Sequence, residues 1–270
     1  MKLKEISLQK QLFSFNAKGF WRVPRKEAGL AIAYKTSNWF TSPILPLPFV
    51  NLQQQNYSMS ASKDLHNNRR NYTKHELTEH KISPNPYEQF GWWLEDATND
   101  GIIEPNAMAL STATADGKPS SRIVLLKAFD ENGFIFYTNY HSRKGREISE
   151  NNAASLLFFW DKLERQVRIE GTIEKIEVHL SEKYFSERPY ESRLSAIVSE
   201  QSEEVPSREY LEDRLEEVKQ QGEIKRPENW GGCILKAEYF EFWQGRASRL
   251  HDRIIYQMEN GAWRIKRLAP

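Results

Sequence analysis

The sequence predicts an α+β domain built on a small closed or split antiparallel β-barrel with peripheral helices. Two observations predict the barrel. Six or seven short segments carry apolar residues at alternate positions, and Asp-Gly and Asn-Gly turns join several of them. A third observation predicts the class, because helical patterns lie between these strand-like segments.

The first predicted elements are one helix and three strands. Residues 85–100 predict a helix, because a proline sits near the first turn and the apolar residues share one face. Strands are expected over 107–114, 120–129 and 134–139, and their tight turns predict an antiparallel meander. The polar residues 66–80 are expected at the surface, either extended or helical.

The middle of the chain predicts a short helix and a hairpin. Residues 141–152 form the helix, which Ser142 could cap. Residues 153–160 are expected to pair with residues 164–177, and Gly171 marks a bulge or bend in the second strand.

Three helices and three strands complete the chain. The helix patterns are followed by strand patterns, and an Asn-Gly turn joins the last two strands. The helices are expected over 179–188, 189–200 and 206–221, and the strands over 231–244, 251–259 and 262–268.

Composition limits the possible function classes. Hydrophobic residues make up 39% of the 270 positions, enough for a core, and the net charge of +1 does not favour nucleic acid or a membrane surface. No apolar run reaches the roughly 18–20 residues of a membrane-spanning helix. The one cysteine, Cys233, excludes an internal disulfide and fits a reducing compartment, so a cytoplasmic location is expected. It lies in a strand-like segment without a nearby histidine, which favours core packing over a nucleophile.

The first 58 residues differ from the rest. They carry eight of the 38 basic and two of the 37 acidic residues, which leaves 30 basic and 35 acidic residues, a net charge of −5, for residues 59–270. This segment could be a targeting segment, a disordered tail, or sequence upstream of a true start at Met59. The third interpretation is preferred, because a globular pattern begins soon after Met59. We therefore expect one folded domain over residues 59–270.

Clusters of cations are the most informative feature. Residues 243–253, WQGRASRLHDR, hold three arginines and a histidine at the end of a predicted strand, which indicates an anionic ligand. Arg122 and Lys127 lie five positions apart in one predicted strand, so alternation points them to opposite faces and favours two anionic groups. Arg143 and Lys144 open a predicted helix and could hold a phosphate, although by themselves they are explained more simply by a capped surface helix with solvated charges.

A further set could hold a second phosphate. Tyr184, Arg188 and Ser192 have helical four-residue spacing, which the intervening proline makes uncertain. The chain contains no glycine-rich nucleotide loop, zinc pattern or serine-hydrolase motif. A bound organic cofactor would therefore have to supply any difficult chemistry.

Taken together, these segments resemble the pyridoxine/pyridoxamine 5′-phosphate oxidase family. The resemblance covers roughly residues 66–270, and GRAS (245–248) is its main departure. The matching segments are RRNY (69–72), SRIVLLK (121–127), FYTNYHSRKG (136–145), LERQVRIEG (163–171), KYFSERPYES (183–192), VSEQS (198–202), WGG (230–232), EFWQG (241–245), RLHDR (249–253) and WRIKRLAP (263–270).

The resemblance implies an FMN-binding split β-barrel that works as a homodimer with two sites at the subunit interface. It implies a flavoprotein oxidoreductase of pyridoxal 5′-phosphate biosynthesis and salvage. Pyridoxamine 5′-phosphate or pyridoxine 5′-phosphate would be oxidised to pyridoxal 5′-phosphate, with O2 as electron acceptor and H2O2 as product. No metal, nucleic acid or membrane is implied.

The resemblance also implies roles for individual residues. Arg249 and His251 would bracket the reacting ring, and residues 69–72 would form a lid. The FMN contacts would be Arg122, Ile123, Val124, Leu125, Leu126, Lys127, Tyr137, Thr138, Arg143, Lys144, Gln166, Gln201, Ser202, Trp243 and Arg253. The substrate contacts would be Arg69, Arg70, Asn71, Tyr72, Lys127, Tyr184, Arg188, Ser192, Arg249, Leu250 and His251.

Other interpretations compete with this one. A different FMN split-barrel enzyme, such as a flavin reductase, would not need the set Tyr184, Arg188 and Ser192 together with RLH. A second alternative is a non-catalytic carrier that binds FMN or pyridoxal phosphate. Release of peroxide on mixing with substrate would distinguish the oxidase from such a carrier. A salt-bridged hairpin, with Asp252 paired to Arg249 or Arg253, would account for part of the C-terminal cluster.

Overall fold

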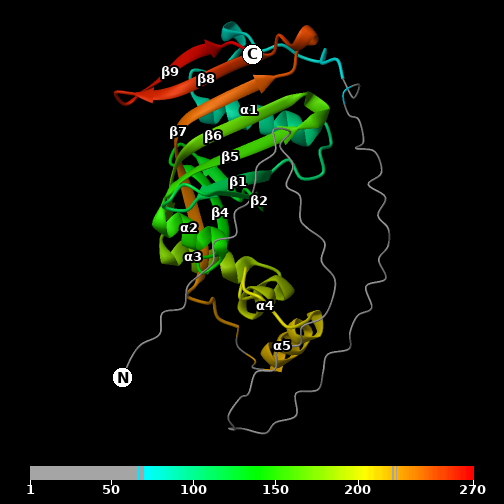
Figure 1. Cartoon of the computed structure of the whole chain (residues 1–270), viewed down its shortest axis with the longest axis vertical. Coiled ribbons are helices and arrows are strands. Elements are labelled where there is room, and N and C mark those ends of the chain that lie inside the picture. The colour runs from blue at the N-terminus through cyan, green and yellow to red at the C-terminus, as the bar shows by residue number, and fades with distance from the viewer. Residues whose placement is uncertain (1–65, 67–69, 221, 223) are drawn as a thin grey trace, which may run out of the picture. The chain divides into compact units, whose positions relative to one another are not determined.

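A curled antiparallel sheet of nine strands forms the centre of the protein (Figure 1). The computed structural model describes residues 66, 70–220, 222 and 224–270. The predictions for residues 1–58, Met59 and Arg69 lie outside this part of the chain. The strands are β1 (Ala107–Ala113), β2 (Pro119–Leu125), β3 (Ala128–Asp130), β4 (Gly133–Asn139), β5 (Ala153–Trp160), β6 (Arg165–Lys175), β7 (Trp230–Gln244), β8 (Asp252–Glu259) and β9 (Ala262–Leu268).

Strand order explains why the sheet is split. The order is β2-β1-β5-β6-β7-β4-β3, and β8 and β9 continue from the second half of β7. β7 pairs with β6 along most of its length, whereas on its other side it pairs first with β4 and then with β8. The long strand β7 thus belongs both to the part of the sheet with β4 and β3 and to the part with β8 and β9. The prediction of an α+β domain with an antiparallel split barrel is confirmed.

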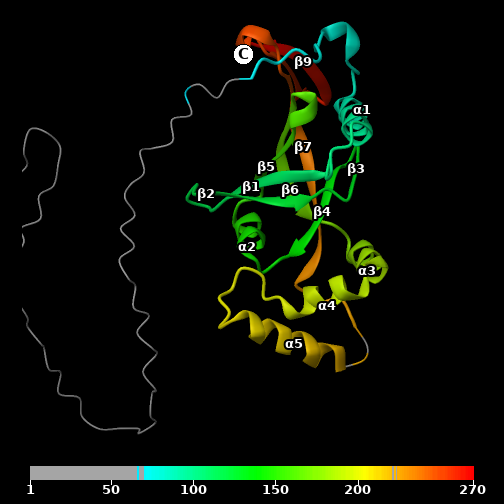
Figure 2. The same cartoon turned by 90° about the vertical axis from the view of Figure 1, so that its right-hand side faces the viewer.

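Helices lie around the sheet, as predicted. Figure 2 shows α4 and α5 side by side, next to one end of the sheet. They are joined through a small apolar cluster of Leu194, Val198 and Val218. The helices are α1 (Pro86–Asn99), α2 (Arg143–Glu150), α3 (Val178–Glu187), α4 (Tyr190–Val198) and α5 (Arg208–Gln220), with short 3-10 turns at Glu79–Lys81, Asp161–Leu163 and Ala247–Arg249. None of the helices in the described ranges is long and apolar enough to cross a membrane.

One part of the predicted topology is wrong. The strand predicted over 120–129 is two strands, and β2 does not continue a meander into β4, which pairs with β7 instead. The break coincides with a change of hydrogen-bonding partner, since the N–H of Leu126 still donates to the carbonyl oxygen of Asn106, next to β1, at 2.9 Å. The following residue, Lys127, donates its N–H to the carbonyl oxygen of Ile135 at 2.8 Å, so the chain folds back onto β4.

Local sequence signals hold elsewhere. Asn85 caps α1 by accepting the N–H of Tyr87, and Ser142 caps α2 by accepting the N–H of Gly145. The bulge predicted at Gly171 is present as a register shift between Glu170 and Gly171. A Cβ at Gly171 would overlap the carbonyl oxygen of Lys236, so only glycine fits this approach of two strands.

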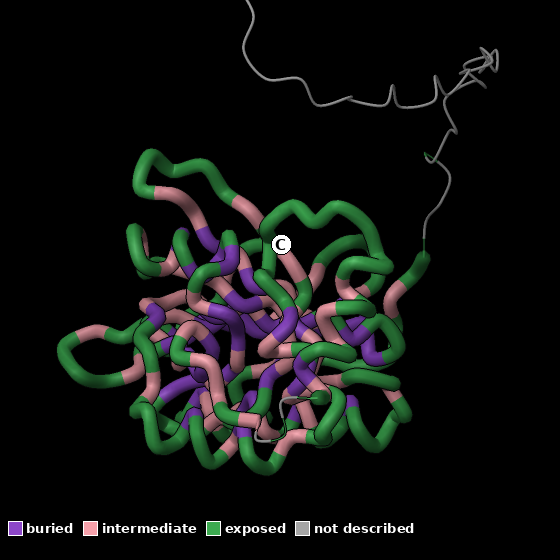
Figure 3. The backbone as a smooth tube through the Cα atoms, turned by 90° about the horizontal axis from the view of Figure 1, so that it is seen from below, coloured by how far each residue is buried: buried purple, intermediate pink, exposed green. Residues whose placement is uncertain are grey.

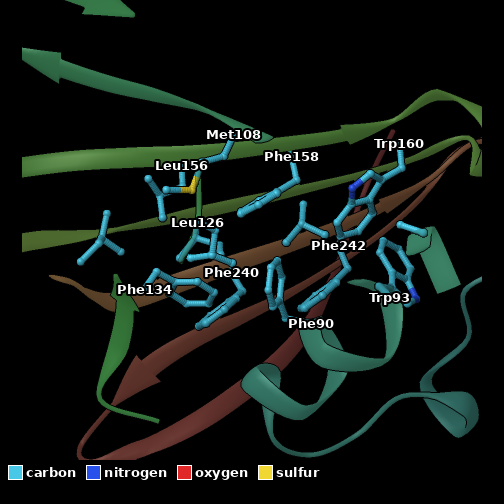
Figure 4. Close-up of a cluster of buried hydrophobic side chains, with 14 of the residues drawn as sticks. Phe90, Trp93, Met108, Leu126, Phe134, Leu156, Phe158, Trp160, Phe240 and Phe242 are labelled. Carbon is cyan, nitrogen blue, oxygen red and sulfur yellow. The ribbon is translucent and has the colours of Figure 1, made fainter. Parts of the chain in front are cut away.

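The core lies between α1 and the inner face of the sheet. Buried residues gather in the centre of the trace while the loops stay exposed (Figure 3). Phe90 of α1 packs edge-on against Phe134 and Phe158, with ring centroids 5.1 and 5.0 Å apart (Figure 4). Burying an aromatic ring of this size contributes roughly 1.5–3 kcal/mol, so this cluster fixes the sheet that carries the site.

Candidate active site

A cavity of about 930 Å³ opens among β2, β4, the start of α2, α3, α4 and the first residue of β7. Fourteen of the predicted site residues line it, although they come from four separate segments of the chain. These are Arg122, Ile123, Val124, Leu125, Lys127, Tyr137, Thr138, Arg143, Lys144, Tyr184, Arg188, Ser192, Gln201 and Ser202. Hereafter it is called the cationic cavity.

The lining of the cationic cavity has an unbalanced charge. Five cations line it, Arg122, Lys127, Arg143, Lys144 and Arg188, and no carboxylate belongs to the described lining. The predicted opposite orientation of Arg122 and Lys127 is wrong, since both line this cavity. The strand ends at Leu125, so the alternation on which the prediction rested does not reach Lys127. Leu126 alone of this run is buried in the core.

Lys144 is a buried cation with neutral partners. Its Nζ donates to Oε1 of Gln201 at 2.8 Å and to Oγ of Ser142 at 3.3 Å. Burial, reinforced by the charge of Arg122, lowers the pKa of Lys144 to about 8. A buried charge of this kind is stabilised when an anion joins it.

Glu147 holds two of the arginines from behind the cavity. Its carboxylate lies 2.8 Å from Nε of Arg143 and 3.2 Å from Nη2 of Arg122. Burial alone would raise the pKa of Glu147, but hydrogen bonds from Ser120, Thr112 and the two arginines outweigh this effect and bring the pKa to about 2. Glu147 was not among the predicted site residues, and its only signal in the sequence was its position four residues after Arg143.

An aromatic stack forms another wall of the cavity. The rings of Tyr137 and Tyr184 are stacked with centroids 3.8 Å apart, and Trp230 is parallel to Tyr137 at 5.5 Å. The guanidinium of Arg188 lies 4.6 Å from the centroid of the Trp230 ring. Trp230 also lines the cavity and was not among the predicted site residues.

Tyr184, Arg188 and Ser192 line the same cavity despite a helix break between them. α3 ends at Glu187, and Arg188 and Pro189 are extended before α4 begins. All three side chains nevertheless line the cationic cavity. The turn at Pro189 replaces a continuous helix, because Pro189 ends the hydrogen-bonding pattern of α3.

The other predicted residues gather at the far end of β7, in a cluster here called the β7-end cluster. Gln166, Trp243 and Arg253 are paired neighbours in a row across β6, β7 and β8. The ring of His251 lies 4.6 Å from that of Trp243, and the ring of Tyr72 lies 5.8 Å from each of them. The predicted lid residue Tyr72 thus contacts the RLHDR segment.

Within the β7-end cluster, His251 has a defined hydrogen bond. Its Nδ1 accepts the backbone N–H of Arg246 at 3.1 Å, so Nε2 is left for other partners. Burial lowers the pKa of His251, and the positive charge of Arg249 lowers it further. Arg249 and Leu250 are exposed, and the backbone of Arg249 is left-handed at φ 61°. The strained turn presents these side chains outward.

The arginine pairings in this cluster differ from the alternative prediction. Asp252 does not pair with Arg249 or Arg253 but lies 2.8 Å from Nη1 of Arg267 and 3.5 Å from Nε of Arg246. Arg253 instead contacts Glu241 at 2.7 Å through Nε. The hairpin is therefore salt-bridged, but through partners that lie on other strands or in the turn.

The two groups of residues are far apart on one protomer. Trp230 begins β7 and Trp243 is next to its end, thirteen residues later, which corresponds to about 40 Å along the strand. Figure 1 shows the two ends of β7 near α3 and near β8, respectively. A small ligand held at the Trp230 edge of the cavity is therefore far from Trp243 and His251 of the same protomer.

Family models match both parts of the described chain. Residues 94–222 match the model described as pyridoxamine 5′-phosphate oxidase, and residues 230–270 match the pyridoxine 5′-phosphate oxidase C-terminal dimerisation region. The pyridoxine/pyridoxamine 5′-phosphate oxidase of Gloeothece citriformis is 52% identical over 206 residues, which cover 75% of this chain and 96% of that protein. The chain belongs to the pyridoxamine 5′-phosphate oxidase family.

Other relatives of the family agree. The corresponding enzyme of Rubrobacter xylanophilus is 52% identical and covered to 98%, with 78% of this chain aligned. An Arabidopsis thaliana relative described as chloroplastic is 53% identical over 74% of this chain but only 39% of its own length. The solved structure of PhzG from Burkholderia lata, in complex with tetrahydrophenazine-1-carboxylic acid, has a TM-score of 0.69 and 32% identity over 72% of this chain and 98% of its own. The family match to the dimerisation region supports a homodimer.

Proposed function

We propose that this protein oxidises pyridoxamine 5′-phosphate or pyridoxine 5′-phosphate to pyridoxal 5′-phosphate, using FMN, with O2 as electron acceptor and H2O2 as product. The observation that carries the proposal is the cationic cavity, where five cations and no carboxylate line the described wall. Such a site suits ligands that bear phosphate groups, because each phosphate needs charge-assisted donors. Both the proposed cofactor and the proposed substrates carry one phosphate.

The residues present fit the phosphate of FMN. Lys144 is buried, and its ammonium group donates hydrogen bonds to the neutral side chains of Gln201 and Ser142. It therefore has no directly bonded counter-charge among the described residues. Arg122 and Arg143 are oriented by Glu147 at the same wall. We assign the FMN phosphate to Arg143 and Lys144, with Arg122, Thr138, Gln201 and Ser202 as further contacts. When bound, FMN would accept the hydride equivalent from the substrate and pass electrons to dioxygen.

The substrate phosphate is assigned to a second set of residues in the cavity lining. This set is Lys127, Tyr184, Arg188 and Ser192, and Nη1 of Arg188 is buried without a hydrogen-bond partner. An unpaired buried donor is costly, and a phosphate oxygen would satisfy it. His251 and Arg249 are assigned to the pyridine ring, where Nε2 of His251 can hold or move a proton and the guanidinium can polarise the ring.

The separation of the two groups supports a site shared between subunits. Trp230 at the cationic cavity and Trp243 in the β7-end cluster lie about 40 Å apart along β7 in one protomer. In a homodimer, the β7-end cluster of one subunit would complete the cationic cavity of the other. Two exposed apolar residues among the proposed ligand contacts fit this arrangement, Ile123 at 67% and Leu250 at 70% exposure.

A complementation experiment tests the shared site. Arg188→Ala damages the cavity, and Arg249→Ala damages the cluster, so each homodimer should turn over slowly. After mixing and reassociation, half of the dimers would be heterodimers with one intact site, and about a quarter of wild-type activity should return. No recovery, with heterodimers demonstrated by two different tags, would mean that each protomer carries its own complete site.

The reaction itself is tested on the purified residues 59–270, which we propose to be one oxidase domain. The protein should be yellow, and pyridoxine 5′-phosphate in air should yield pyridoxal 5′-phosphate and peroxide in equal amounts. A yellow protein that makes neither product, also in the full-length chain, would contradict the proposed function. The cytoplasmic location stays a prediction, since one relative is described as chloroplastic.

A further inference from the structure

Trp230 is the first residue of β7 and one of the best-buried aromatic residues at the cationic cavity, at 7% exposure. Its ring supports the guanidinium of Arg188, whose Cζ lies 4.6 Å from the ring centroid. On other sides it is bordered by Tyr137, stacked at 5.5 Å, and by Phe185, edge-on at 5.3 Å. The indole therefore has little freedom to move away from Arg188.

Arg188 is held differently from the other arginines of the cavity. Arg122 and Arg143 each contact the carboxylate of Glu147. Arg188 makes no ion pair with any described residue, and its Nη1 is buried without a hydrogen-bond partner. Arg188 is half-buried, so its charge is partly removed from water, and this burial lowers its pKa.

The kind of support matters for the function of Arg188. A carboxylate partner would occupy its N–H donors and neutralise its charge before a ligand arrived. An aromatic face attracts the cation through the ring quadrupole and uses no donor. Arg188 on Trp230 therefore keeps its charge and its directed donors available for an incoming anion.

We propose that Trp230 is a positioning residue that makes the site selective for phosphorylated substrates by holding Arg188 ready for the substrate phosphate. This inference rests on the proposed function. Trp230 itself need not touch the phosphate. Without the ring, Arg188 would have to be ordered by each binding substrate, so the cost would appear in substrate binding rather than in the chemical step.

Two substitutions at Trp230 test whether Arg188 is held by the aromatic face of the ring or only by the volume of the side chain. Trp230→Phe keeps an aromatic face, and Trp230→Leu keeps an apolar side chain without one. With the dimeric, FMN-loaded enzyme, we expect Trp230→Leu to raise KM for pyridoxine 5′-phosphate roughly tenfold, and to raise the inhibition constant of inorganic phosphate by a similar factor. Trp230→Phe should stay within about threefold of wild type, and kcat and FMN content should change little in either variant.

A double-mutant cycle tests whether the effect runs through Arg188. In an Arg188→Ala background, Trp230→Leu should have no further effect on KM, because the group that it positions is gone. Trp263→Leu is the matched control, since Trp263 also packs against buried rings but at Tyr87 and Phe240, and does not line the cavity. It should leave KM unchanged. If circular dichroism shows that Trp230→Leu does not fold, KM is measured instead for Trp230→Phe, alone and combined with Arg188→Ala.

The outcomes are distinct. The positioning role would be overturned if Trp230→Leu also raised KM tenfold in the Arg188→Ala background. It would likewise be overturned if the Trp230→Phe and Trp230→Leu variants had equal KM values. A wild-type enzyme that does not oxidise pyridoxine 5′-phosphate would instead overturn the proposed function, and would be seen before any variant is compared.

Discussion

Glu164 and Thr73, which are 91 positions apart in the sequence, are joined by a hydrogen bond in which Oε2 of Glu164 accepts the N–H of Thr73 at 2.9 Å. The same oxygen accepts the N–H of Lys74 at 3.2 Å, and Arg70 lies 3.6 Å from the other carboxylate oxygen. Glu164 is only 2% exposed. One buried carboxylate thus fastens the segment that carries Tyr72 against the β7-end cluster.

We predict that Glu164→Ala releases this segment. Two backbone N–H groups lose their acceptor, at a cost of about 1–3 kcal/mol for that segment. Trypsin should then cut after Arg70 or Lys74 several times faster than in wild type, as followed by mass spectrometry. Glu174→Ala, which removes an exposed carboxylate paired with Lys236, is the control and should leave the cutting rate unchanged. Equal cutting rates in both variants would contradict the anchoring role.

From the lowered pKa of Lys144 we predict that FMN binding weakens at high pH. Its pKa of about 8 means that the free site loses this charge as pH rises through 8. The FMN phosphate favours the charged form, so the FMN dissociation constant should rise above pH 8, by up to about tenfold per pH unit. Fluorescence titration of the apoprotein between pH 7 and 9.5 measures this. Lys144→Arg should remove the slope because a guanidinium stays charged there; the same slope in that variant would exclude Lys144 as its origin.

Arg143 and Arg249 should have opposite effects. Arg143→Ala removes a proposed FMN-phosphate contact and should weaken FMN binding by roughly ten- to a hundredfold, while enzyme saturated with FMN keeps most of its kcat. Arg249→Ala should retain FMN but lose about a hundredfold in kcat/KM. Flavin content after gel filtration and steady-state rates separate the two. Equal loss of both properties in the Arg249 variant would argue against its assignment to the substrate.

Glu147 predicts acid sensitivity. Its pKa falls from an ordinary value of 4.5 to about 2 in the folded protein. A depressed folded-state pKa adds stability that is fully present above pH 4.5 and is lost as pH falls toward 2. Glu147→Gln should therefore destabilise the protein by about 1–3 kcal/mol at pH 7, and the difference should shrink below pH 4. Urea unfolding at pH 7, 5 and 3 tests this; a constant difference would show that the carboxylate charge is not involved.

Several elements were predictable from local sequence. Pro86 marks the first turn of α1, Ser142 caps α2, and Gly171 marks a bulge, because each signal acts through atoms that are near in the chain or through the backbone of one residue. The break after Leu125 could not be predicted in this way. There the chain leaves the β1 side and the N–H of Lys127 bonds to Ile135 of β4, a change of pairing partner that no residue type in RIVLLK marks.

The candidate site shows the same division. The sequence by itself determined which residues we propose for the chemistry, because the cations and their spacing in RIVLLK, SRK, ERPYES and RLHDR can be read without the fold. Only the tertiary structure decided that Arg122 and Lys127 share one cavity, that Glu147 and Trp230 support its arginines, and that RLHDR lies at the other end of β7. These relations depend on strand pairing and on side-chain packing between distant segments, and no local pattern in the chain encodes such pairings.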